Sequence, residues 1–215
     1  MAETPGRRPL ASRQTAWAGR IARRLAATQI TPNQISIAGM VAAGLGGAAL
    51  WGAGGADGAW RAVLLLAAAG FIQIRLLCNL FDGMVAIEAG RASPDGGFWN
   101  EAPDRVSDGL ILIGAALGAG VPGLGWAAVS FAFLTAYIRE LGANLGQGVD
   151  FAGPMAKQHR MALMTGAAVF AAIWSVRGDP GMVIRAALWV VTLGAALTAA
   201  RRSLRLLHRL RGGAG

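Results

Sequence analysis

Polar side chains that could bind a metal ion or move a proton interrupt two otherwise apolar stretches of the sequence. In the first stretch, Arg75, Asn79 and Asp82 recur at helical spacing, which places them on one face of a helix. The second stretch has a face of the same kind, made of Asn100, Asp104 and Asp108. Because polar groups are costly in an apolar helix, we interpret both faces as parts of one functional site.

Two interpretations of these acids are open. Carboxylates held close together repel one another in an apolar surrounding, so they persist as anions only where a cation neutralises them. Oxygen ligands from Asp and Asn favour a hard divalent ion, Mg²⁺ or Mn²⁺. The alternative is that the acids form structural ion pairs with the arginines near them in the sequence, Arg75, Arg91 and Arg105.

A group of basic residues lies further along the chain. Arg139 stands late in one apolar run, and Lys157 and Arg160 stand at the start of the next. Such side chains can bind a phosphate group on a substrate. For Lys157 and Arg160 an equally weighted alternative is that they mark the cytoplasmic side of the membrane. Lys157 is the only lysine in the sequence.

Helices in a membrane are expected to position these residues. A composition of 54% apolar and 14% charged residues does not suit a soluble globule of 215 residues. Six apolar runs approach the length of about 20 residues that a spanning helix needs. They lie at roughly 34–54, 60–87, 101–120, 123–144, 160–177 and 181–202. The sequence therefore predicts an all-α, polytopic membrane protein with six transmembrane helices.

Basic residues at the two ends predict the orientation. Six arginines lie before residue 25 and five lie after residue 200. Because Lys and Arg are retained on the cytoplasmic side, we expect a multi-pass protein of the cell's inner membrane with both termini cytoplasmic. The net charge of +9 is assigned to contact with the membrane surface, and no nucleic-acid partner is expected.

A short helix is predicted before the first span. Trp17, Ile21 and Leu25 recur at four-residue spacing among arginines, a pattern typical of a helix lying in the membrane interface. Thr31 is expected to cap the first span, and Pro32 fits its first turn. The predicted organisation is a cytoplasmic segment with the interfacial helix at 1–33, a six-helix transmembrane domain at 34–202 and a basic cytoplasmic tail at 203–215.

The spacing of the polar residues resembles the motif of CDP-alcohol phosphotransferases. That motif is Asp, two residues, Asp-Gly, two residues, Ala-Arg, a spacer, Gly, three residues, Asp, three residues and Asp. The matching residues here are Asn79, Asp82, Gly83, Ala86, Gly96, Asn100 and Asp104. Other segments that look like the family are Thr31-Pro32-Asn33, Arg139-Glu140 and Lys157-Gln158-His159-Arg160, so the resemblance covers nearly the whole chain.

The resemblance implies a membrane enzyme of phospholipid synthesis. In the family, Mg²⁺ or Mn²⁺ holds the pyrophosphate of a CDP-alcohol, commonly CDP-diacylglycerol. A hydroxyl of an alcohol acceptor, small or lipid, attacks the phosphorus nearer the lipid, and CMP leaves.

The match also implies a role for each residue. Asp82 and Asp104 would be metal ligands, helped by Asn79, Asn100 and Asp108. The catalytic base would be Asp104, with Asp108 as its rival one turn further along the helix. The nucleotide-binding residues would be Asp82, Gly83, Ala86 and Gly96. The residues that bind the phosphate of acceptor or donor would be Arg139, Lys157 and Arg160.

Three positions depart from the family pattern. The first and third aspartates are Asn79 and Asn100 here, and the arginine is Ile87. Two missing carboxylates mean less charge to hold two divalent ions, so a two-metal site cannot simply be carried over. Asp108, on the same face as Asn100 and Asp104, is expected to restore charge better than Glu101, unless it only pairs with an arginine.

Two other functions compete with the transferase. A family member that is catalytically inactive but still binds lipid or nucleotide would explain the three departures, although retained acids in lipid argue against it. A transporter would also bury charge in a six-span bundle, but paired broken helices are not recognisable in the sequence. A homodimer is expected from the resemblance and from glycine-rich faces, which Gly114 and Gly118 illustrate.

Overall fold

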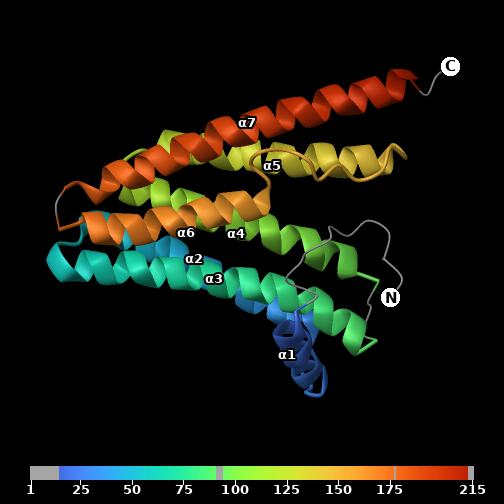
Figure 1. The fold of residues 1–215 in the computed structure, drawn as a ribbon, viewed down its shortest axis with the longest axis horizontal. Coiled ribbons are helices and arrows are strands. Elements are labelled where there is room, and N and C mark those ends of the chain that lie inside the picture. Colours follow the sequence, from blue (N-terminus) through green and yellow to red (C-terminus); the bar gives the residue numbers. More distant parts are fainter. Residues whose placement is uncertain (1–14, 91–93, 177, 213–215) are drawn as a thin grey trace.

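The computed structural model describes residues 15–90, 94–176 and 178–212, and the regular structure within these ranges is helical throughout. This confirms the all-α prediction. Six long helices run roughly along one axis, and a short helix lies across them at one end (Figure 1). The long helices are α2 (Pro32–Gly55), α3 (Gly58–Glu88), α4 (Gly96–Gly118), α5 (Pro122–Asn144), α6 (Lys157–Trp174) and α7 (Pro180–Gly212).

The start of α2 is fixed by the predicted cap. The Thr31 hydroxyl accepts a hydrogen bond from the Gln34 backbone N–H at 3.2 Å, and the Gln34 side chain accepts one from the Thr31 N–H at 2.9 Å. This reciprocal pair satisfies two backbone donors that a helix start leaves unpaired, and Pro32 supplies no donor there. At the other end of α2, Gly58 adopts a φ of +53° in the turn to α3, a conformation that side chains with Cβ rarely adopt.

Two helix boundaries differ from the predicted ones in a way that matters for the site. Helix α4 begins at Gly96 and not near residue 101, so Asn100 lies on the helix and shares a face with Asp104. Helix α7 continues without a break to Gly212, past the boundary predicted between residues 202 and 203. The residues of the proposed tail that are described therefore extend the last helix.

Helices α2, α3 and α7 are long and apolar enough to cross a membrane. The other three long helices carry charged residues near one end: Glu101, Asp104 and Arg105 on α4, Arg139 and Glu140 on α5, and Lys157 and Arg160 on α6. All of these charged ends lie at the same end of the bundle. The chain is a helical membrane protein whose buried charge gathers at one end.

Close backbone packing holds α2 against α4. A Cβ atom added at Gly114 would overlap the Gly47 backbone, and one added at Gly54 would overlap Gly118. Only glycine permits this approach, which brings the two helices together along their length. The packing fixes where α4 stands relative to the α2–α3 pair and therefore where its acids point.

Helix α1 (Ala16–Ala26) crosses the end of α3, as Figure 1 shows. Its alanines Ala18 and Ala22 are fully buried against α3, and the Trp17 ring meets Phe81 edge-on with centroids 6.1 Å apart. Ile21 stays partly exposed. The predicted helix is confirmed, and its position in the membrane interface remains a prediction.

Candidate active site

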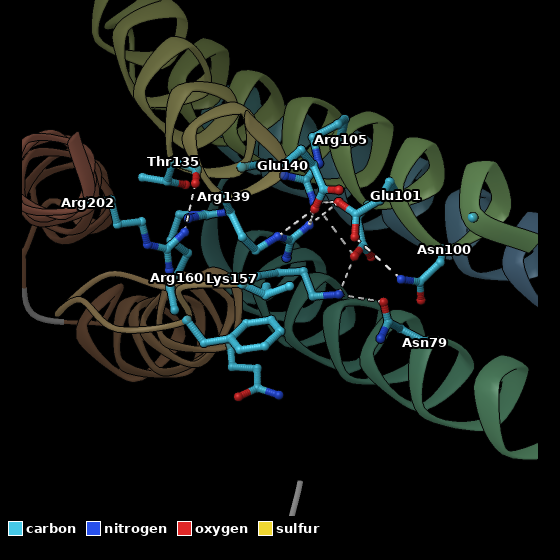
Figure 2. Close-up of a pocket in the computed structure, with 17 residues that line it drawn as sticks. Asn79, Asn100, Glu101, Arg105, Thr135, Arg139, Glu140, Lys157, Arg160 and Arg202 are labelled. Atoms are coloured by element: carbon cyan, nitrogen blue, oxygen red, sulfur yellow. Dashed lines mark hydrogen bonds and ion pairs between the residues drawn. The ribbon is translucent and has the colours of Figure 1, made fainter. Parts of the chain in front are cut away.

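A cavity of about 360 Å³ opens at the charged end of the bundle. Its walls come from α3, α4, α5, α6 and α7 and from the segment between α5 and α6 (Figure 2). We call it the large cavity. Its charged lining residues are Glu101, Asp104, Arg105, Arg139, Glu140, Lys157, Arg160 and Arg202. Five of these eight are cationic, so the large cavity suits an anionic ligand.

A second, much smaller cavity adjoins the first. It measures about 10 Å³, close to the room that one water molecule needs. All four positions that match the family's aspartates line it: Asn79, Asp82, Asn100 and Asp104. We call these the motif positions. Asn79, Asn100 and Asp104 line both cavities, so the two spaces share a wall.

Asp104 is the most heavily contacted acid in that wall. Its Oδ1 atom accepts a hydrogen bond from Arg75 Nη2 at 2.8 Å, and its Oδ2 atom accepts one from the Lys157 ammonium. Arg105 lies 3.8 Å from the same Oδ2 atom. The side chain is almost completely buried. These contacts hold the Asp104 side chain in one orientation.

Asp82 has different surroundings. Its Oδ2 atom accepts a hydrogen bond from the Ser36 hydroxyl at 2.9 Å, and its Oδ1 atom accepts one from the Gly83 N–H. Among the described residues it forms no ion pair. Asp82 is thus the acid at the motif positions whose negative charge these residues leave without a cation.

Asp108 does not face either cavity. It is fully buried, with Oδ2 accepting from Arg160 Nη2 at 2.6 Å and Oδ1 lying 3.7 Å from Arg75 Nη2. Helical periodicity placed it on the Asp104 face, but Arg160 approaches from α6 and covers it. These contacts are those of the stated alternative, pairing with arginine, and a role of Asp108 in metal binding or as the base stays a prediction.

The Glu101 carboxylate is also paired with arginines. It accepts hydrogen bonds from Arg105 at 3.2 Å and from Arg139, which also donates to Glu140 at 2.8 Å (Figure 2). Arg91 lies outside the described residues. The ion-pair interpretation thus describes the contacts of Arg75 and Arg105, whereas Asp82 and the small cavity are left for a ligand.

The remaining predicted residues fall into two groups. Arg139, Lys157 and Arg160 line the large cavity, as a phosphate-binding role requires. Three predicted nucleotide-binding residues, Gly83, Ala86 and Gly96, line neither of the two cavities, whereas Gly97 lines the large one. Their role stays a prediction.

Sequence reasoning missed Arg202, which lines the large cavity. Arg202 Nη1 donates to the Thr135 carbonyl at 2.7 Å, and its Nε donates to the Ala152 carbonyl at 2.9 Å. Arg202 is buried although it comes from a run that resembles a basic tail. The only feature of the sequence that could have indicated a buried Arg202 is its position at the end of the last apolar run. At that position the sequence does not distinguish an arginine that faces the bundle from one in a basic tail.

The motif positions fit one divalent ion and not two. Among the described residues, no three Asp, Glu, His or Cys side chains converge as a metal site, because two of the four positions are asparagines. The small cavity nevertheless gathers four oxygen-bearing side chains around room for about one small sphere, with the Asp82 charge unpaired. One hard cation suits that set of donors.

Fold and site together describe a helical membrane protein with a cationic cavity beside a small oxygen-lined one. No family model matches the chain. Among curated proteins, it is 31% identical over 140 residues to phosphatidylinositol phosphate synthase of Streptomyces avermitilis, covering 61% of this chain and 57% of that protein. It is 39% identical over 84 residues to archaetidylinositol phosphate synthase of Methanothermobacter thermautotrophicus, covering 38% and 40% respectively. The matches thus span about half the length of these relatives.

Solved structures extend the likeness to nearly the whole chain. Mycobacterium tuberculosis phosphatidylinositol phosphate synthase with CDP-DAG bound superposes with a TM-score of 0.73 at 20% identity, covering 89% of this chain and 94% of that one. The same synthase in complex with manganese and citrate gives 0.72, covering 88% of both. The chain has the fold of these synthases, and the resemblance to CDP-alcohol phosphotransferases is confirmed.

Proposed function

We propose that this chain is a CDP-alcohol phosphatidyltransferase, which transfers a phospho-alcohol group from CDP-diacylglycerol to an alcohol and releases CMP. The observation that carries the proposal is the shared wall: three motif positions, with Asp104 among them, face both cavities. A transfer assisted by a bound cation needs a group within reach of both the cation and the substrate, and Asp104 lies between the cavities proposed for them.

The acceptor that fits the large cavity carries a phosphate. Arg139, Arg160 and Lys157 line it together with Arg202, and cationic side chains of this kind bind phosphate oxygens. The related synthases are named for products that contain an inositol phosphate. We therefore propose a phosphorylated polyol such as an inositol phosphate as the acceptor.

In the proposed reaction, the acceptor hydroxyl oxygen forms a bond to the phosphorus nearer the lipid. Its proton passes to a carboxylate oxygen of Asp104, and the bond from that phosphorus to CMP breaks with its electron pair leaving on CMP. Asp82, with the other motif positions around it, would hold one Mg²⁺ or Mn²⁺, which would stabilise negative charge on the phosphate oxygens. Manganese is bound in a related synthase structure.

The membrane arrangement proposed with this function has α2 to α7 as six spans and the charged end in the cytoplasm. Three helices meet the length and composition of a span by themselves. The charges of α5 and α6 lie near one end of each helix, whereas those of α4 extend to Asp108 in its middle, and the remainder of each helix is apolar. An even number of spans agrees with Figure 1, where α1 and the last turns of α7 lie at the same end.

CMP release from purified full-length protein tests the function. The protein would be supplied with Mg²⁺ and CDP-diacylglycerol, and inositol phosphate, inositol and glycerol 3-phosphate would be added one at a time. We expect release with inositol phosphate and little with inositol. No release with any alcohol would favour the inactive, ligand-binding alternative.

A further inference from the structure

The Lys157 ammonium stands between two of the motif positions. Its Nζ atom donates to Asn79 Oδ1 at 2.6 Å and also to Asp104 Oδ2 (Figure 2). Lys157 is the first residue of α6, whereas Asn79 and Asp104 come from α3 and α4. Three separate helices thus meet at this one cation.

Neutralising Asp104 does not by itself explain this position. Arg75 already pairs with the other oxygen of Asp104 at 2.8 Å and is buried beside it. Asn79 carries no charge, so the short contact with it adds no ion pair. The ammonium instead uses two oxygens at the motif positions, as a small cation would.

The number of charges at the motif positions agrees with Lys157 acting as a cation there. Asp82 and Asp104 supply two negative charges, and Lys157 already supplies one positive charge beside Asp104. A divalent ion placed between Asn79 and Asp104 would have to displace the ammonium and would be repelled by it in a site of low dielectric. Asp82 forms no ion pair among the described residues, and Arg75, which also lines the small cavity, is paired with Asp104 and Asp108.

We propose that Lys157 is a built-in cation of the site: it occupies the place of a second metal ion, so the chain binds a single divalent ion beside Asp82. This inference rests on the proposed function, because that function requires a divalent ion. It gives Lys157 a role as a cation at the motif positions, beside its place in the wall of the large cavity.

Direct measurement of bound Mn²⁺ by electron paramagnetic resonance tests the stoichiometry on the full chain. We expect one Mn²⁺ per chain in the unchanged protein and its loss in Asp82→Asn. The double variant Asn79→Asp with Lys157→Met restores a carboxylate and removes the ammonium, and we expect it to bind two. The matched control, Asn79→Asp with Gln158→Met, should bind one.

A second readout needs no variant. Since Lys157 is the only lysine, lysine labelled with ¹³C at Cε gives one side-chain signal, which Mn²⁺ bound nearby should broaden strongly. If Lys157 keeps its place, Zn²⁺ should leave the signal's chemical shift close to its metal-free value. A large shift would mean that metal displaces the ammonium.

Any of these results would overturn the inference: two Mn²⁺ in the unchanged protein, none in it, Mn²⁺ retained in Asp82→Asn, no second ion in the double variant, or a large shift of the Lys157 signal with Zn²⁺. CMP release decides the proposed function separately. A protein that releases CMP but binds two Mn²⁺ would keep the function and lose the built-in cation.

Discussion

Asp82 and Asp104 are the two carboxylates left at the motif positions, and their neighbours differ. Asp104 has arginine and lysine partners, whereas Asp82 has a hydroxyl and a backbone N–H. One acid is therefore held fixed where the two cavities meet, and the other keeps its charge for a bound cation.

Replacing either acid should remove most activity. We expect Asp82→Ala and Asp104→Ala to lower the rate of CMP release at least about a hundredfold, because each loses a group that stabilises the transfer. EDTA should have a similar effect that added Mg²⁺ reverses. The control is Asp179→Ala, an exposed acid outside both cavities, which should keep its activity. Near-normal rates in either site variant would refute the site.

Asp108 should behave as a structural residue. Because it is fully buried against Arg160 and Arg75, Asp108→Asn leaves buried positive charge uncompensated, which typically costs about 3–5 kcal/mol. We expect a lower thermal unfolding midpoint and an unchanged Mg²⁺ dependence of the activity that remains. A weakened Mg²⁺ dependence at normal stability would return Asp108 to the metal site.

Helical spacing was enough to predict which side chains of the site share a face. It brought Asn79 together with Asp82, and Asn100 together with Asp104, and the structure places all four around one cavity. It could not say which neighbouring helix covers each part of a face, so the contact of Asp108 with Arg160 from α6 was not predicted. Arg202 was missed for the same reason, since its partners are distant in the sequence.

At the scale of the helices, turn chemistry predicted most boundaries to within a few residues. Thr31-Pro32 and Val121-Pro122 start helices where expected, because proline lacks the N–H that a first turn leaves unpaired. The start of α4 was missed. Its first turn begins with two glycines, which do not indicate a helix start.

The α2–α4 contact should tolerate no added methyl group. Gly114→Ala would push a Cβ into the Gly47 backbone, so we expect a loss of about 1–3 kcal/mol in stability, measured as a lower unfolding midpoint in one detergent. Gly109→Ala on the same helix is the matched control. A Cβ there meets no atom within 4 Å, and the substitution should be neutral or slightly stabilising. Equal effects of the two substitutions would refute the close contact.

At the scale of the whole molecule, tryptophans mark the end opposite the cavities. Trp51, Trp60 and Trp126 stand near the turns that join α2 to α3 and α4 to α5, and all three are at least 60% exposed. Exposed tryptophan is typical of the boundary between lipid and water. We infer that this end lies at a membrane interface, and the basic residues at the two ends of the sequence predict that it is the outer one.

Cysteine labelling tests this orientation. In a Cys78→Ala background, a maleimide that does not cross membranes should label Asp57→Cys in intact cells. Asn144→Cys, at the cavity end, should react only after the cells are opened. Labelling of Asn144→Cys in intact cells would reverse the proposed orientation.

The predicted homodimer loses part of its support. Gly114 and Gly118, which illustrated a glycine-rich face, pack against α2 within the same chain. They are therefore used inside the bundle and are not offered to a second copy. The dimer stays a prediction that rests on family resemblance.

Arg202 also has a consequence for how the protein is made. Chains are synthesised from the amino terminus, and early segments begin to fold first. Helices α2 and α4 can associate through their glycines before α7 exists, but Arg202 reaches the Thr135 and Ala152 carbonyls only when α7 is in place. A nascent chain stalled after α6 would thus have a packed scaffold and an unfinished anion site, which only the synthesis of α7 completes.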